Sequence, residues 1–175
     1  MVKMNLFDNA LSSLNQGLKC LDMADNGDKE QFKFAILHIC HYTEIALKYA
    51  VHYMHPLLVY KKPFSGNLKK EMTITSRDAL FIIKNCAETD SLEQTDLSHN
   101  DINMLNIIKR TRNSIEHYRF EFSSKEVRFD IQFLLSVIDD ILTDICKSPI
   151  SEALETKEFN YYSDLMESFE LMVNE

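Results

Sequence analysis

The fold is decided by one stretch, residues 28–55, which reads DKEQFKFAILHICHYTEIALKYAVHYMH. Its apolar residues recur at helical spacing and occupy nearly every side of the predicted helix: Phe32, Ala35, Ile36, Ile39, Ala46, Leu47 and Ala50. A helix on the surface of a protein is apolar on one side only, so this pattern is typical of a helix buried inside a bundle. Pro56 ends the helix.

The composition extends the same prediction to the rest of the chain. Of 175 residues, 45% are hydrophobic, and there are only three Gly and three Pro. So few turn-forming residues favour long helices joined by few connections over many short strands. We therefore predict an all-α protein with one domain, residues 1–175. It is an antiparallel helical bundle of about four to five core helices, with an added C-terminal amphipathic helix.

Five further helices are predicted from apolar spacing and from start and stop signals, over residues 4–24, 76–87, 98–120, 125–147 and 157–173. Asn26 and Gly27 stop the first helix. Ser98 with Asp101, and Ser123 with Glu126, have the spacing of capping boxes. We expect Pro149 to close the helix over residues 125–147, and residues 57–75 to form a loop.

Cysteine usage and hydropathy bear on the compartment. The four cysteines, Cys20, Cys40, Cys86 and Cys146, are scattered singly and predict reduced thiols in the core rather than a disulfide framework. No apolar run approaches the length that spans a bilayer, and the first residues lead directly into an amphipathic pattern. We therefore expect a cytoplasmic protein with no membrane partner.

The net charge of −8 counts against a nucleic-acid partner, but its distribution changes that conclusion. Residues 151–175 contain seven acidic residues and one Lys, so residues 1–150 carry only about −2. The body of the protein can therefore hold a local basic site. The acidic segment 151–175 would suit a regulatory cover that repels or mimics RNA, or it is simply a solvated helix face.

A second stretch carries the chemistry: residues 112–117 read Arg-Asn-Ser-Ile-Glu-His, near the end of the predicted helix 98–120. A guanidinium is permanently cationic and binds phosphate oxygens through two donors, while an imidazole exchanges a proton near neutral pH. Arg112 and His117 together suit cleavage of a phosphodiester. A plainer interpretation also stands, because Arg112 and Glu116 are four apart and can form an ordinary surface pair.

Polar side chains also gather elsewhere. On the apolar helix 28–55, a stripe of five polar residues lies within about 80° of helix surface: His41, Glu44, Lys48, His52 and His55. It lines either a cleft that supports the 112–117 site or a solvated seam with a Glu44–Lys48 pair. Lys61, Lys62, Lys69 and Lys70 in the loop either contact a phosphate backbone or form a solvated cluster. Nothing in the stripe completes a metal coordination sphere, and we expect neither metal nor cofactor.

The helix containing Cys40-His41-Tyr42-Thr43-Glu44-Ile45-Ala46-Leu47-Lys48, followed by Arg112-Asn113-x-x-x-His117 near the end of another helix, resembles the HEPN superfamily. The resemblance covers residues 4–147, and its specific part is the six-residue motif. It implies a helical bundle and a metal-independent endoribonuclease site. The implied catalytic residues are Arg112, Asn113 and His117, often completed across a homodimer.

The resemblance also bears on partners. Some members paired with a nucleotidyltransferase antitoxin carry a Tyr two places after the His, where this chain has Arg119, with Tyr118 one place early. That type of antitoxin is therefore in doubt, although an antitoxin or a defence-complex partner remains an expectation. Arg119 would add positive charge, and Glu44 would fix Arg112.

Geometry constrains the mechanism. Five residues along a regular helix correspond to 500°, so Arg112 and His117 would point about 140° apart. Either the helix loosens before His117, or the Arg of one subunit meets the His of the other. A symmetric dimer would bring two copies of each residue to one cleft and supply acid, base and positive charge.

Two classes of function remain open. The first is an RNA-cleaving toxin or phage-defence effector that attacks unpaired RNA, whose backbone adopts the in-line geometry that a stacked duplex resists. The second is a non-catalytic bundle that serves as a dimerisation, ligand-binding or complex-assembly module. Low overall basicity favours the second, and the intact Arg112, Asn113 and His117 favour the first.

Overall fold

The computed structural model describes residues 5–68, 72–86, 99–116 and 123–173, and within these the side chains of Asp101, Arg112 and residues 114–116 lie outside the description. Six α-helices are found in the described residues: α1 (Leu6–Asp25), α2 (Gln31–Met54), α3 (Ser76–Cys86), α4 (His99–Glu116), α5 (Ser124–Cys146) and α6 (Thr156–Val173). Two short 3₁₀ helices, Pro56–Val59 and Ile150–Ala153, join them. The predicted all-α bundle is confirmed.

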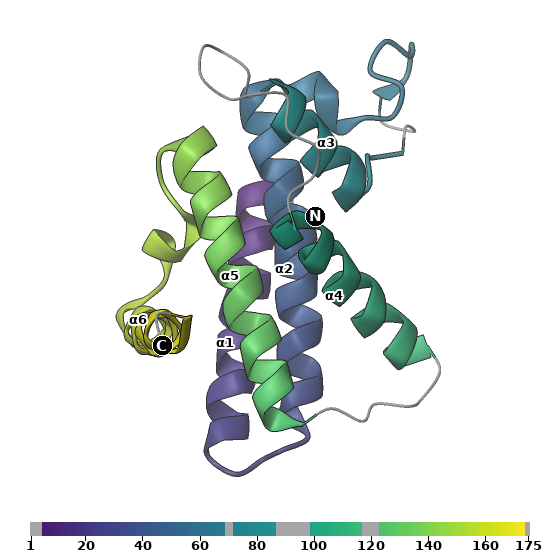
Figure 1. The fold of residues 1–175 in the computed structure, drawn as a ribbon. Coiled ribbons are helices and arrows are strands. Elements are labelled where there is room, and N and C mark those ends of the chain that lie inside the picture. The colour runs from purple at the N-terminus through teal and green to yellow at the C-terminus, as the bar shows by residue number, and fades with distance from the viewer. Residues whose placement is uncertain (1–4, 69–71, 87–98, 117–122, 174–175) are drawn as a thin grey trace, which may run out of the picture.

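Helix α2 is the centre of the bundle (Figure 1). It packs against α1, α3, α4 and α5, which explains why its apolar residues occupy nearly every side. Tyr42, Ala46 and Leu47 have no exposed surface. Directly joined α1 and α2 run in opposite directions, whereas α2 and α5 run in the same direction (Figure 1).

Local signals set most helix ends. At the start of α1, the Asn5 side chain accepts a hydrogen bond from the Asp8 backbone N–H at 2.8 Å. In the turn that follows the end of α1, Gly27 has a positive φ of 113°. The predicted capping box at α5 is confirmed, since Ser123 and Glu126 each accept the other's backbone N–H at 3.1 and 2.9 Å. The predicted box at Ser98 lies outside the described residues.

Helix α5 ends where the sequence predicts. Its last residue is Cys146, and Lys147 caps it in the left-handed conformation with φ 63°, two residues before Pro149. The cysteines are free thiols, but only Cys20 and Cys40 are buried, and Cys86 is exposed at the end of α3. The predicted core position is therefore confirmed for Cys20 and Cys40 and wrong for Cys86, while Cys146 is half-buried and packs against the core.

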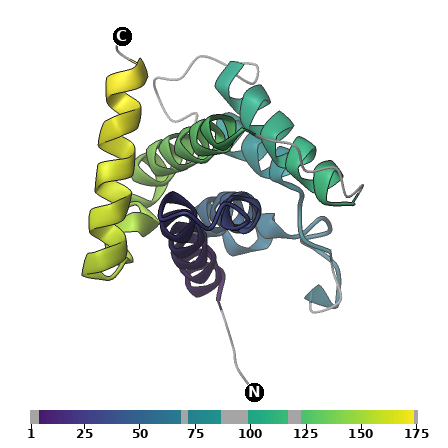
Figure 2. The ribbon, with the colours of Figure 1, turned by 90° about the horizontal axis from the view of Figure 1, so that it is seen from below.

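The acidic C-terminal helix α6 packs across α1 and α5 (Figure 2). Its own residues Tyr162, Leu165 and Phe169 are buried against the bundle. Phe159 and Met172, which the spacing placed on the same side of the helix, are exposed. Figure 2 shows α6 on one side of the bundle and α4 on the other. Of the two interpretations of the acidic segment, this position favours the solvated helix face over a cover on a basic cleft.

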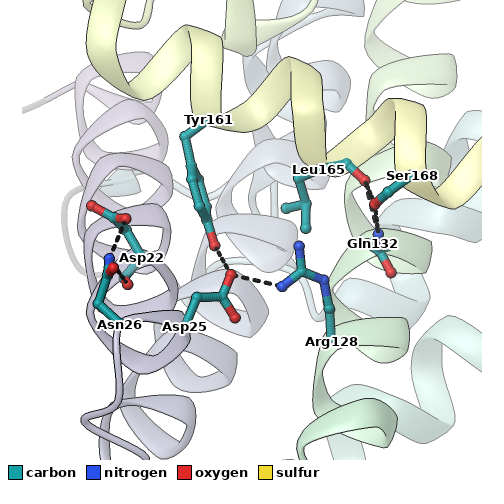
Figure 3. Close-up of polar contacts among 8 residues, drawn as sticks. All are labelled: Asp22, Asp25, Asn26, Arg128, Gln132, Tyr161, Leu165 and Ser168. Atoms are coloured by element: carbon teal, nitrogen blue, oxygen red, sulfur yellow. Dashed lines mark hydrogen bonds and ion pairs between the residues drawn. The ribbon is translucent and has the colours of Figure 1, made fainter.

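A polar network fixes α6 in place (Figure 3). Asp25 at the end of α1 accepts from Tyr161 Oη and from Arg128 Nη1, both at 2.6 Å. Further along, the Gln132 side chain donates to the Leu165 carbonyl and to Ser168 Oγ, both at 2.8 Å. These contacts tie α1, α5 and α6 to one another.

None of the helices in the described residues has the length and apolar character needed to cross a membrane.

Candidate functional site

A cavity of about 510 Å³ opens between α2, α4 and the segment that leads into α3. We call it the α2–α4 cavity. The described residues that line it are Glu44, Lys48, Lys61, Met72, Thr73, Ile74, Thr75, Ser76, Arg77, Leu105, Ile108, Lys109 and Asn113. It lies on the side of the bundle away from α6, where Figure 2 shows α4 and the segment before α3 flanking α2.

Helix α2 supplies one wall through Glu44 and Lys48, which stand one helical turn apart. Glu44 is only 9% exposed, and its neighbours on α2, Thr43 and Ala46, are completely buried. Lys48 Nζ donates to Thr73 Oγ1 at 3.2 Å, so this Lys reaches across the cavity wall to the facing segment. The central helix therefore places one acid and one cation at the cavity, two of the five residues of the predicted polar stripe.

The second wall is a loop held by an isolated antiparallel bridge between Tyr60 and Thr73, here called the bridged loop (described residues 60–68 and 72–75). The Lys61 backbone N–H donates to the Met72 carbonyl, and that of Ile74 donates to the Val59 carbonyl, both at 2.9 Å. These bonds hold the two arms of the loop together, so that Lys61 and Met72 both line the cavity.

The bridged loop passes directly into α3 through a reciprocal cap. Thr75 Oγ1 accepts from the Asp78 backbone N–H at 3.2 Å, while Asp78 Oδ2 accepts from the Thr75 N–H at 2.9 Å and from its hydroxyl at 2.8 Å. The backbone and side-chain hydrogen bonds from Thr75 lower the pKa of Asp78. This cap fixes the start of α3 and with it Ser76 and Arg77 at the cavity edge.

Helix α4 supplies the third wall. Leu105 and Ile108 give an apolar floor, and Lys109 and Asn113, one turn apart, give polar groups. Leu105, Ile108, Lys109 and Asn113 thus mark the stripe of α4 that faces the cavity.

The opposite side of α4 is anchored to α5. Arg110 donates to the Asp130 carboxylate, a half-exposed cation on a largely buried acid. Burial raises the pKa of Asp130, and the Arg110 guanidinium opposes that shift. This ion pair joins α4 to α5, while Met104, Ile108 and Thr111 on α4 are buried in the core.

The cavity is electropositive. Its described lining contains four cations, Lys48, Lys61, Arg77 and Lys109, against one acid, Glu44. Cations gathered in a partly enclosed cleft raise the local concentration of an anionic ligand and fit phosphate groups. The near-neutral body expected from the sequence thus holds a local basic site, although the whole chain carries −8.

The structure brings together four of the residues that the sequence singled out: Glu44, Lys48, Lys61 and Asn113. Lys62 is exposed in the bridged loop and does not line the cavity. The Arg112 side chain, and all of His117, Tyr118, Arg119, Lys69 and Lys70, lie outside the described residues. The catalytic assignment of Arg112 and His117 therefore stays a prediction.

The three histidines of the polar stripe do not join the cavity. His41 Nδ1 shares a hydrogen bond of 2.8 Å with Ser13 Oγ on α1, and His52 is exposed. His55 Nδ1 accepts from the Leu57 backbone N–H at 3.2 Å and caps the 3₁₀ helix. Within the part of the chain that the structure describes, no three His, Cys, Asp or Glu side chains come close enough to hold a metal ion.

Sequence reasoning missed Arg77 and Lys109. Lys109 stands four residues before Asn113, so helical spacing from the motif was a usable signal. Arg77 has no such signal, because its position depends on the path of the bridged loop.

Comparison with protein-family models, with curated proteins and with solved structures finds no match to this chain.

Proposed function

We propose that the α2–α4 cavity is the active site of a metal-independent endoribonuclease of the HEPN type, acting as a toxin or phage-defence effector. One observation carries the proposal: Asn113, next to Arg112 in the motif, lines the same electropositive cavity as Lys48, Lys61 and Lys109. A motif suited to phosphodiester cleavage thus borders a site suited to binding phosphate.

The reaction is attack of the RNA 2′-hydroxyl on the adjacent phosphorus. It needs a base for the hydroxyl proton, an acid for the leaving 5′-oxygen, and positive charge on the phosphorane-like transition state. His117 supplies the proton transfers, and two copies in a homodimer divide the acid and base roles. Arg112 and the cavity lysines supply the charge.

The remaining residues hold the reacting groups in position. Asn113 is exposed on the cavity wall and offers an amide donor to a phosphate oxygen. Glu44 is nearly buried on the facing helix, where its carboxylate orients a guanidinium on α4. Arg119 adds positive charge next to the motif, and Tyr118 directly follows His117 in the sequence.

The test is incubation of the purified protein with total RNA in EDTA, for wild type, Arg112→Ala and His117→Ala. His52→Ala is the matched control, since His52 is an exposed histidine outside the cavity. We expect wild type and His52→Ala to cleave and to leave 2′,3′-cyclic phosphate ends, and the two motif variants to be inactive. Circular dichroism melting of all four proteins checks that each is folded.

A monomer measured by light scattering at the assay concentration would remove the composite dimer site while leaving a single-subunit site. Cleavage that survives both motif substitutions would refute the catalytic assignment. Growth arrest on expression of wild type, absent with His117→Ala, would support the effector role.

The cavity volume favours a second candidate, a non-catalytic ligand-binding module. About 510 Å³ lies within the range of sites for small molecules, roughly 300–1,000 Å³. Saturable binding of a nucleoside monophosphate, abolished by Lys109→Gln, together with no RNA cleavage, would favour this alternative.

A further inference from the structure

The bridged loop carries an aromatic side chain that nothing in the described chain covers. Phe64 is 93% exposed, and the next most exposed large hydrophobic residue of the described chain is Met72, at 69%, on the same loop. Leaving a Phe side chain in water forgoes about 1.5–3 kcal/mol of burial free energy. Two such residues on one loop therefore indicate a binding surface.

The loop geometry connects Phe64 to the cavity. Phe64 lies in a turn closed by the Ser65 backbone N–H, which donates to the Lys62 carbonyl at 3.1 Å. Lys61 and Met72, hydrogen-bonded to each other across the loop, both line the α2–α4 cavity. The turn that holds Phe64 is thus part of the loop whose two arms line the cavity, with Lys61 at the cavity wall and the exposed aromatic ring three residues further along the chain.

We infer that Phe64 stacks on an unpaired base of the RNA whose phosphates bind in the cavity, and that this contact selects single-stranded over duplex RNA. The inference rests on the proposed function. A positive groove beside an exposed aromatic ring is the usual arrangement in proteins that bind single strands, because the ring stacks on a base while the cations bind the backbone. Met72, exposed on the same loop, adds an apolar contact between Phe64 and the cavity cations.

Selection of single strands follows from the stacking itself. In a duplex each base is already stacked above and below, so an aromatic side chain gains a base face only by unstacking one. An unpaired base in a loop or single strand offers its face at no such cost. Phe64 is therefore a specificity-determining residue, and the cavity cations set affinity for any RNA backbone.

The chain offers a direct probe, because it contains no Trp. Phe64→Trp creates a single tryptophan at the loop tip, whose emission is quenched when a nucleobase stacks on it. Phe159→Trp on α6 is the matched control, since Phe159 is a partly exposed aromatic on the far side of the bundle. Both are titrated with a fully 2′-O-methylated oligoribonucleotide, which lacks the attacking hydroxyl and is not cleaved.

We expect saturable quenching of Phe64→Trp by the single strand, much weaker quenching by the matching duplex, and none for Phe159→Trp. In anisotropy measurements, Phe64→Ala should weaken single-strand binding roughly 5- to 100-fold, as loss of one stacked base does elsewhere, and Phe64→Tyr should restore it. The slope of log affinity against log salt should stay the same in Phe64→Ala, but fall by about 0.7 in Lys61→Gln.

Each failure is distinguishable. Equal binding by wild type and Phe64→Ala, or equal quenching by duplex and single strand, overturns the stacking inference. If unmodified RNA is still cleaved in a motif-dependent way by those proteins, the proposed ribonuclease stands without it. Absence of any RNA binding by wild type overturns both proposals.

Discussion

Replacing Gly17 by Ala tests how closely α1 approaches the central helix. Gly17 is buried on α1, and a Cβ placed there would lie 2.6 Å from Ile39 Cδ1 and 2.9 Å from Ile39 Cγ1 on α2. It would also lie 3.4 Å from His38 Cβ. Contacts under 3.0 Å between carbon atoms are well inside van der Waals separation, so a neighbour must move.

Two effects of the substitution oppose each other. Ala is favoured over Gly in a helix by about 1 kcal/mol, which would stabilise α1. Overpacking a close-packed interior costs about 1–3 kcal/mol, and Ile39 has no exposed surface toward which to move. We expect the clash to prevail, with a net loss of about 1 kcal/mol and a melting temperature lower by roughly 2–4 °C in a domain of this size.

Urea unfolding followed by far-ultraviolet circular dichroism measures the change. Adding Ile39→Val removes the Cδ1 atom that clashes, and alone it should cost about 0.5–1.5 kcal/mol. The double variant should be less destabilised than the sum of the two single variants by about 1 kcal/mol, the signature of a relieved contact. Gly66→Ala is the control, because no heavy atom lies within 4 Å of its added Cβ, and its effect should stay within about 0.5 kcal/mol.

A stabilised Gly17→Ala protein, as helix propensity alone would give, would refute the close-packing argument. So would strictly additive single and double variants.

Three further predictions concern stability. Burial raises the pKa of Asp139, so the free energy of unfolding should fall as the pH rises from about 3.9, the unfolded value, to the raised value. Asp139→Asn should remove this fall when both proteins are unfolded by urea across that pH range. If the free energy of unfolding changes with pH in the same way in both proteins, the prediction is wrong. Ser123→Ala removes the α5 cap and should cost about 1 kcal/mol by the same assay, whereas no change would show the cap to be redundant. Tyr161→Phe loses the hydroxyl bond to Asp25 and should cost about 1 kcal/mol and speed hydrogen exchange in α6; unchanged exchange would separate this bond from α6 docking.

The helices were predictable from sequence because their signals are local. Apolar spacing and the Ser123 capping box depend on residues within a few positions of one another, and α5 begins where they indicate. The end of α5 near Lys147 was predicted as well, because Pro149 cannot continue a helix. The left-handed conformation of Lys147 itself was not predicted, since L-residues rarely adopt it.

The site was predictable only in part, for the same physical reason. Glu44 and Lys48 share one helix face, so their joint position follows from periodicity once α2 is recognised as a helix. The meeting of Lys61 and Arg77 with Asn113 depends on the fold of the bridged loop and on how α4 packs on the core, where Met104 and Thr111 are buried. Both are tertiary facts that no local pattern encodes.

The position of α6 reconciles a net charge of −8 with the proposed binding of phosphate in the α2–α4 cavity. Helix α6 lies on the side of the bundle opposite to the cavity (Figure 2). A single helix with its side chains is about 10–12 Å across. The Debye length at physiological ionic strength is about 8 Å, so the acids of α6 are largely screened from a phosphate bound near Lys61 and Lys109. Affinity is then set by the cavity cations and not by the overall charge. Removing α6 acids by Glu→Gln substitution should accelerate RNA association at low salt while leaving the affinity at 150 mM salt nearly unchanged.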